Sequence, residues 1–190
     1  VHRLDDPRRR VVTAMWQDAR DSLGAWTHPA PEQIALRDAY LAHLDEHPDG
    51  VWRECRVGHI TASALVMDDA RERVLLTLHP KVGRWLQLGG HIERDDPTLR
   101  DAARREAIEE SGITEVTMSV QPVRLDRHPV PCSGSMGVHL DVQYLAIVPN
   151  DAMAVRSEES DDLRWFALDA LPDGLDASVQ HLIRDAVNGG

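Results

Sequence analysis

The sequence contains few of the residues that would tie this chain to a disulfide framework, a membrane or a polyanion. Its two cysteines, Cys55 and Cys132, are too few for a disulfide framework and lie in no metal-ligand spacing. No apolar run approaches the roughly 18 to 20 residues of a membrane span, and the charged N-terminus does not resemble a signal peptide. Acidic residues outnumber basic ones by 32 to 21, which gives a formal charge of −11 and argues against nucleic acid or an anionic membrane as a partner. We therefore expect a soluble, cytosolic protein.

The 190 residues are enough to bury one sizeable core. Apolar periodicity predicts two helices, over 6–23 and 31–46, and His47-Pro48-Asp49-Gly50 then breaks the pattern. We interpret residues 1–50 as an N-terminal helical hairpin extension and residues 51–190 as the main domain. The hairpin is a wall of the substrate pocket, a homodimer surface or structural cladding, and we favour cladding.

The period changes after residue 51, and the pattern becomes that of a domain with mixed α and β structure. A hairpin over 57–67 and 73–78 is followed by a short strand at 85–88 that leads into Gly89 and Gly90. The remaining predictions are strands over 115–123, 139–148 and 163–168, a flexible loop over 129–137, and a closing helix over 177–187 with Val187 inward.

The stretch from residue 89 to 113 organises the rest of the chain. On a helical wheel over 99–110, Leu99, Ala102, Ala103 and Ala107 share the side expected to face the core. In the later turns that side carries acids instead, namely Glu106, Glu109 and Glu110. Carboxylates three and four residues apart repel one another. A hard divalent cation that prefers oxygen ligands, Mg²⁺ or Mn²⁺, is the natural counter-charge.

This stretch resembles the Nudix box, the signature of the Nudix hydrolase superfamily. Residues 105–113 match the second half of that signature in full, from Arg105-Glu106 through Glu109-Glu110 to Gly112-Ile113. The first half departs from it. The segment from Gly90 to Arg105 is one residue too long, and the position of the first glutamate falls on Asp96 or Pro97.

The resemblance implies an α/β fold, the Nudix-type α/β/α sandwich with a mixed sheet, here with the helical extension in front. It also implies hydrolysis of a nucleoside diphosphate linked to another moiety, X, by attack of water on one phosphorus of the pyrophosphate. The implied metal ligands are Glu106, Glu109 and Glu110 with the backbone of Gly90, and Arg105 would hold a neighbouring carboxylate. One of the glutamates would act as the base, and Asp96 would substitute for the missing glutamate with a shorter reach.

Several residues outside the acidic helix are further candidates. His139 and Asp141 share one face of a strand and, with His128, are suited to bind a second metal, a phosphate-bearing substrate or only ordinary hydrogen-bond partners. Glu159, in preference to Glu158, is a candidate metal ligand or base in the loop before the last strand. Arg84 and His91 complete the predicted substrate site, while Trp85 and Trp165 are expected to be core residues more often than base-stacking ones.

A competing hypothesis is a Nudix-fold nucleotide-binding or regulatory module with little or no turnover, which the altered first half of the box motivates. Retention of all three glutamates argues against it. An isomerase on the same fold, such as isopentenyl diphosphate isomerase, is disfavoured because neither cysteine lies in a context that resembles the active site of that branch.

Overall fold

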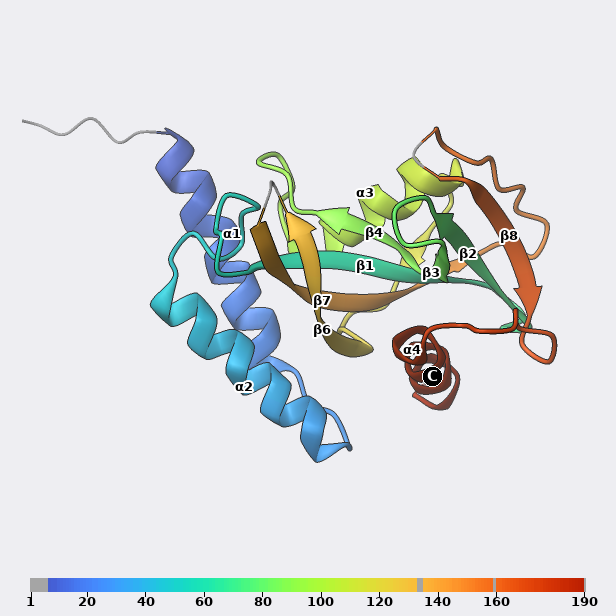
Figure 1. Ribbon diagram of the computed structural model, residues 1–190, viewed down its shortest axis with the longest axis horizontal. Helices are drawn as coiled ribbons and strands as arrows, with labels where there is room; N and C mark the ends of the chain where they lie inside the picture. Colours follow the sequence, from blue (N-terminus) through green and yellow to red (C-terminus); the bar gives the residue numbers. More distant parts are fainter. Residues whose placement is uncertain (1–6, 133–134, 159, 190) are drawn as a thin grey trace, which may run out of the picture.

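One mixed sheet separates two helical layers in the computed structural model, which describes residues 7–132, 135–158 and 160–189 (Figure 1). Helix α3 lies on one side of the sheet and α4 on the other, while α1 and α2 lie side by side at one end. The elements in chain order are α1 (Pro7–Ala25), α2 (Pro31–Glu46), β1 (His59–Asp68), β2 (Arg73–His79), β3 (Arg84–Leu86), β4 (Leu88–His91), α3 (Leu99–Ser111), β5 (Thr117–Met118), β6 (Arg124–Cys132), β7 (Ser135–Val148), β8 (Asp162–Ala167) and α4 (Ala177–Asn188). This is the predicted α/β/α sandwich with a helical N-terminal region.

Strand β1 is the centre of the sheet. It pairs in parallel with β7 along its whole length, so that His59 lies opposite His139 and Thr61 opposite Asp141. On its other edge β1 pairs antiparallel with β4, where Thr61 lies opposite His91, and then with β2. The edges of one strand therefore bring together segments that are far apart in the sequence.

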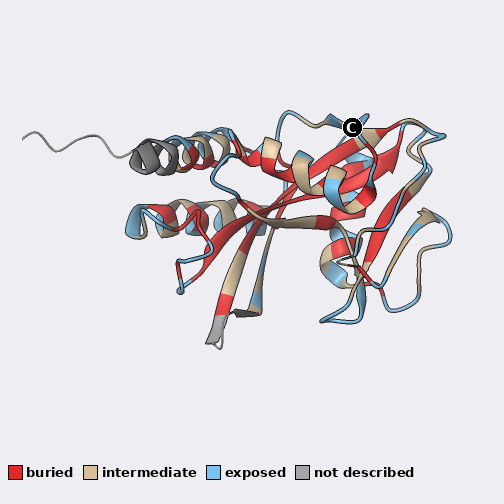
Figure 2. Cartoon of the chain, turned by 90° about the horizontal axis from the view of Figure 1, so that it is seen from above, coloured by how far each residue is buried: buried red, intermediate tan, exposed pale blue. Residues whose placement is uncertain are grey.

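The two faces of β1 differ in chemistry. Residues with even numbers from Ile60 to Val66 belong to one apolar core with buried side chains of α1, α2 and α3. On the opposite face Leu65 and Met67 pack in a second core beneath α4. Nearer the start of the strand that same face carries His59, Thr61 and Ser63, all buried. The sheet thus has a polar, buried half-face beside α4, and the buried strands at its centre are visible in Figure 2.

The N-terminal helices share their core with the sheet and also contact it through polar groups. The amide of Gln33 makes two hydrogen bonds with the backbone of Leu125 on β6, at 3.1 and 2.8 Å. The carboxylate of Asp18 on α1 accepts a 2.8 Å hydrogen bond from the backbone N–H of Leu99. Because the first N–H groups of a helix have no partner within it, α1 helps to cap α3.

The predicted loop over residues 129–137 is wrong where the structure describes it. Residues 129–132 belong to β6 and residues 135–137 to β7, paired as a hairpin. Pro129 and Pro131 suggested a loop because proline cannot donate to a ladder. β6 pairs only with β7 within the described ranges, and an edge strand can turn missing N–H groups toward its outer side.

Other predicted boundaries also need correction. The strand over 115–123 reduces to β5, because Ser119 and Val123 bond to Leu145 and Gln143 of β7 and the residues between them loop out. The strand predicted at 85–88 is divided between β3, which pairs with β2, and β4, which contains both glycines. Val187 is 44% exposed rather than inward. Residue 6, the predicted start of the first helix, lies outside the described residues.

No described helix combines the length and hydropathy required to cross a membrane.

Candidate active site

Helix α3 is fixed at both ends by its own sequence. The side chain of Thr98 accepts a hydrogen bond from the N–H of Asp101 at 3.1 Å and donates to the Asp101 carboxylate at 2.7 Å. At the other end Gly112 has a φ of 69°, and its N–H bonds to Ile108. The predicted apolar face is confirmed, since Leu99, Ala102, Ala103 and Ala107 are all buried. The helix is therefore a rigid support for the acids of its last turns.

Arg105 connects the loop and the helix. Its guanidinium binds both carboxylate oxygens of Asp96 at 3.0 Å, and it donates to the carbonyl of His91 at 3.0 Å. The same side chain contacts Glu106 at 3.0 Å and Glu109 at 2.9 Å. Burial opposes its charge, but the hydrogen bonds that it donates to Asp96 and the negative charge of Glu106 outweigh burial and raise the pKa of Arg105. One fixed cation thus holds three carboxylates in position.

Of the two residues that fall at the position of the missing glutamate, Asp96 is the one that pairs with Arg105. It is 8% exposed, and its Oδ2 also accepts a 2.8 Å hydrogen bond from the backbone N–H of Glu93. Aspartate is one methylene shorter than glutamate, and the loop is one residue longer than the signature. In this longer loop the backbone brings the shorter carboxylate of Asp96 within hydrogen-bond distance of Arg105. The Glu93 side chain itself is exposed.

Gly90 lies directly against the carboxylate of Glu106. A Cβ at residue 90 would be 2.7 Å from Oε1 of Glu106, closer than real contacts allow. Glu106 is mostly buried, with a side-chain exposure of 14%, whereas Glu109 is 57% exposed and Glu110 is half-buried. The bare backbone of Gly90 lies beside one carboxylate of α3, and the same helix carries two more. These oxygen donors fit a hard divalent cation.

A second group of titratable side chains lies on the polar half-face of the sheet. His59 on β1, His91 on β4 and His139 on β7 have ring centroids 4.9 to 5.1 Å apart, and His128 on β6 lies 5.4 Å from His139. We call these four residues the histidine cluster. Burial and the charge of His59 lower the pKa of His91 to about 4, and burial with the neighbouring histidines lowers the pKa of His139 to about 3. The structure brings together the three predicted histidines and adds His59.

Asp141 lies deeper than a residue in direct contact with substrate. It is 3% exposed and accepts hydrogen bonds from Thr61, Ser63, Gln87 and Gln143 at 2.6 to 3.2 Å. Burial raises its pKa, and the hydrogen bonds oppose that rise. The side chain orders the polar half-face from beneath.

The remaining predicted residues are dispersed. Arg84 is 61% exposed and pairs with Asp176, the N-cap residue of α4, at 2.7 Å. Trp85 packs on Phe166 and Arg164, and Trp165 packs against the apolar core and beneath Arg73, so both tryptophans serve packing. Glu159 lies outside the described residues.

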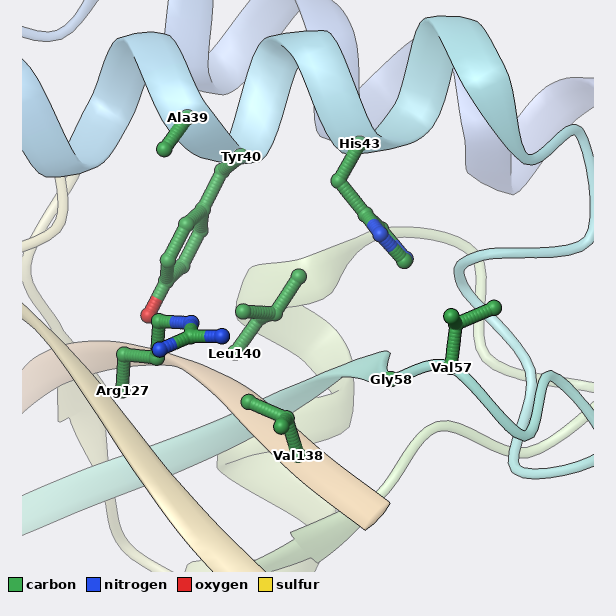
Figure 3. Close-up of a pocket in the computed structure, with 8 residues that line it drawn as sticks. All are labelled: Ala39, Tyr40, His43, Val57, Gly58, Arg127, Val138 and Leu140. Atoms are coloured by element: carbon green, nitrogen blue, oxygen red, sulfur yellow. The ribbon is translucent and has the colours of Figure 1, made fainter.

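A cavity of about 370 Å³ lies between α2 and the sheet, apart from the predicted residues (Figure 3). Helix α2 forms one wall, and His43 points toward Val57 while the hydroxyl of Tyr40 lies near Arg127. Its lining is Ala39, Tyr40, His43, Val57, Gly58, Arg127, Val138 and Leu140. No sequence pattern pointed to it, since its lining comes from four distant segments.

Comparison with known proteins identifies the family of this fold. The sequence model described as NUDIX domain matches residues 58–186, so the chain belongs to the Nudix family and is a Nudix hydrolase. Enzymes of this class generally hydrolyse pyrophosphate linkages.

The curated and solved relatives agree on the family. The chain is 30% identical over 115 residues to the NAD-capped RNA hydrolase NudC of Pseudomonas aeruginosa, an alignment that covers 60% of this chain and 38% of the relative. It therefore spans well under half of the length of that relative. A NUDIX-family hydrolase from Clostridium perfringens superposes with a TM-score of 0.54 at 24% identity, over 68% of this chain and 96% of that one. The NUDIX domain of Shewanella oneidensis NrtR, complexed with ADP ribose, gives 0.52 at 20% identity over 68% and 86%.

Proposed function

We propose that the protein hydrolyses the pyrophosphate linkage of a nucleoside diphosphate joined to another moiety, with Mg²⁺ or Mn²⁺ as its cofactor. The observation that carries this proposal is the arrangement around Arg105. Asp96, Glu106 and Glu109 share one guanidinium, and Glu106 lies against the bare backbone of Gly90. A carboxylate cluster with a fixed geometry supports catalysis by positioning and charge neutralisation.

The proposed metal ligands are the backbone of Gly90 and the carboxylates of Glu106, Glu109 and Glu110. A bound divalent ion supplies charge neutralisation at the phosphates and a lower pKa for its water. The residues of the chain would position the metal ligands and accept the proton. Arg105 keeps Glu106 and Glu109 at fixed distances, and one of the three glutamates, or Glu159, accepts the proton of the attacking water.

The substrate is proposed to bind where β4 passes from Gly90, which faces Glu106 of α3, to His91, whose ring lies on the polar half-face. His91 belongs to both regions, because its carbonyl accepts from Arg105 while its ring joins the histidine cluster. His128 and His139 extend the surface along β6 and β7, and Asp141 positions it through Thr61 and Ser63. Arg84 offers an exposed cation at the far side, where it now pairs with Asp176.

The competing proposal, a binding module with little turnover, differs in one respect that experiment can test. Incubation with Mg²⁺ and a panel of ADP-ribose, NDP-sugars, dinucleotides and nucleoside triphosphates, followed by detection of mononucleotide, should reveal one preferred substrate. ADP-ribose and NAD should be tested first. The NUDIX domain of NrtR was solved with ADP ribose, and the NudC relative is named as an NAD-capped RNA hydrolase. Tight binding of a panel member without any turnover would favour the module.

The variant Glu109→Gln tests the metal assignment itself. Loss of one metal-binding carboxylate removes several kcal/mol of transition-state stabilisation, so we expect a fall in kcat of about a hundredfold or more. Because Glu109 is 57% exposed, the fold should persist, with an unchanged Tm. Glu115→Gln, an exposed acid beyond the helix, is the matched control. Full activity of Glu109→Gln would refute the assignment.

The N-terminal helices have a supporting role in this proposal. We interpret residues 1–50 as an extension that supports α3 through Asp18 and forms one wall of the cavity under α2. Residues 51–190 form the hydrolase domain. The proposed setting is the cytosol, with a small nucleotide derivative rather than nucleic acid or membrane as partner, and dimerisation through α1 and α2 is a proposal that light scattering can test.

A further inference from the structure

Three histidine side chains converge on one point at the polar half-face. His59, His91 and His139 come from three adjacent strands, β1, β4 and β7, and a ring nitrogen of each lies within 4.8 Å of a ring nitrogen of the others. The backbone ladders hold all three Cα positions, so the convergence does not depend on a loop. Three imidazoles on a rigid support are the donor set of a transition-metal site.

His59 is oriented as a metal ligand would be. It is 2% exposed, and its Nδ1 lies 3.4 Å from the carbonyl oxygen of Cys55. A carbonyl can only accept, so Nδ1 carries the hydrogen and Nε2 carries the lone pair. Nε2 is buried and has no hydrogen-bond partner among the described residues. A buried acceptor without a donor costs free energy unless something binds it, and a cation at the centre of the three rings would satisfy it.

Outer contacts are also of the kind that support a metal ligand. His128 lies beside His139, and its Nδ1 contacts the carboxylate of Asp126 at 2.8 Å. A carboxylate bonded to one ring nitrogen directs the other nitrogen outward and increases its basicity. His128 is therefore placed beside the three-histidine group, with its Nδ1 engaged by Asp126.

The geometry points to a site for a first-row transition-metal ion of the zinc class, bound by His59, His91 and His139. Such ions take imidazole nitrogens at about 2.0–2.1 Å, which in a tetrahedron places the nitrogens roughly 3.4 Å apart. Small rotations of the rings bring the present spacing, within 4.8 Å, to that value. Mg²⁺ prefers oxygen ligands and belongs to the carboxylates instead. The two centres thus select ions of different chemistry.

Co²⁺ is the probe for this site, because a four- or five-coordinate Co²⁺ bound by nitrogen absorbs visible light much more strongly than an octahedral one bound by oxygen. The full chain, stripped with a chelator and kept in excess Mg²⁺ to occupy the carboxylates, is titrated with Co²⁺. We expect one equivalent to bind with strong visible absorption and to be displaced by Zn²⁺. No saturable absorption at one equivalent would overturn the proposal. This readout is independent of hydrolase activity.

Variants locate the ion. His91→Ala and His139→Ala should each weaken Co²⁺ binding by more than about a hundredfold, since even outer-shell partners contribute 10- to 100-fold. Circular dichroism and Tm without metal show whether each variant is folded, and His91→Gln replaces any variant that is not. His181→Ala, an exposed histidine on α4, is the matched control and should bind as the parent does.

Two other groups must be excluded as the source of the signal. His47, Asp49 and Cys55 also lie within ligand distance of one another, so Cys55→Ser should leave binding unchanged and no sulfur-to-cobalt charge-transfer band should appear. The double variant Glu106→Gln/Glu109→Gln should also retain the one equivalent. Loss of the signal in either variant, or its persistence in both histidine variants, would refute the assignment to the histidines.

Discussion

The acidic centre at Arg105 and the histidine cluster are adjacent, but they are built in opposite ways. The acidic centre comes from one continuous stretch, from Gly90 on β4 to Glu110 on α3, and Arg105 offsets part of its negative charge. The histidine cluster comes from four strands, and burial keeps at least His91 and His139 neutral near pH 7. One centre is a charged network of local contacts, and the other is a group of imidazoles assembled by the sheet, in which His91 and His139 are uncharged.

The two centres should therefore differ in how much stability a single substitution removes. Removing either partner of the Arg105–Asp96 pair leaves the other partly buried and uncompensated, so it should cost much stability. His91 and His139 are neutral already, and their replacement by a neutral side chain of similar shape should cost little stability unless protons are added. The following substitutions test that contrast.

The largest expected effect follows from Arg105→Ala. Asp96 would remain buried without its bidentate partner, and the loss of one member of a buried ion pair costs about 3–5 kcal/mol. Urea unfolding measures this directly. Arg104→Ala, at the neighbouring exposed position, should stay within about 0.5 kcal/mol of the parent. Equal values for the two variants would show that the network contributes nothing to stability.

Asp96→Asn should have the next largest effect. The amide keeps the shape but loses the charge, and hydrogen bonds to charged groups contribute about 1.5–3 kcal/mol. Asp96→Glu, which restores the residue of the family signature, should recover at least half of the lost stability because it keeps the carboxylate. If Asn is tolerated fully, Asp96 does not serve as the missing glutamate.

Gly90→Ala separates catalysis from stability. The new Cβ would meet the flexible end of Glu106 at 2.7 Å, so the carboxylate must move while the backbone stays. We expect kcat to fall about tenfold, equivalent to about 1.4 kcal/mol, with little change in Tm. Gly89→Ala should behave in the reverse manner, since its Cβ would meet Ser63 Cβ and Cα at 2.3 and 2.6 Å and strain the strand pairing.

The histidine cluster should make the folding stability depend on pH. The pKa values of His91 and His139 are lowered by burial to about 4 and about 3, so below about 6.5 the unfolded chain binds protons that the folded chain does not. Stability is then lost as pH falls from about 6.5 toward 4.

The double variant His91→Gln/His139→Gln isolates this loss. Between pH 6.5 and 4.5 its metal-free stability should fall by about 1 kcal/mol less than that of the parent, after allowance for solvent screening. Urea unfolding at several pH values with a chelator present is the measurement. Parallel stability curves for parent and variant would contradict the assigned neutral state.

The same contrast explains how much of the molecule could be predicted from sequence. Helix α3, its apolar face and its glycine end follow from contacts within a few residues, and these predictions hold. Because the loop has an irregular length, the sequence left the position of the first glutamate open between Asp96 and Pro97, and only the structure places Asp96 at Arg105. The grouping of His91, His128 and His139 was anticipated only in part, and His59 was missed. A histidine in a strand becomes informative only when the register that places it opposite His139 is known.

The β6–β7 hairpin was missed for a related reason. Prolines at 129 and 131 indicate a break by local rules, whereas their position on the outer edge of the sheet, a property of the whole fold, makes them acceptable in a strand. Local physics therefore predicted the helices and the acidic centre, and topology decided the rest.

The parallel pairing of β1 with β7 also determines the order in which the protein can assemble. Thr61 and Asp141, joined side by side, are 80 residues apart in the chain, and such distant pairings form slowly because a long loop must close first. During synthesis α3 leaves the ribosome before β7, so the acidic centre can acquire its local contacts while β1 still lacks its partner. The histidine cluster is completed only when β7 joins the sheet beside β1.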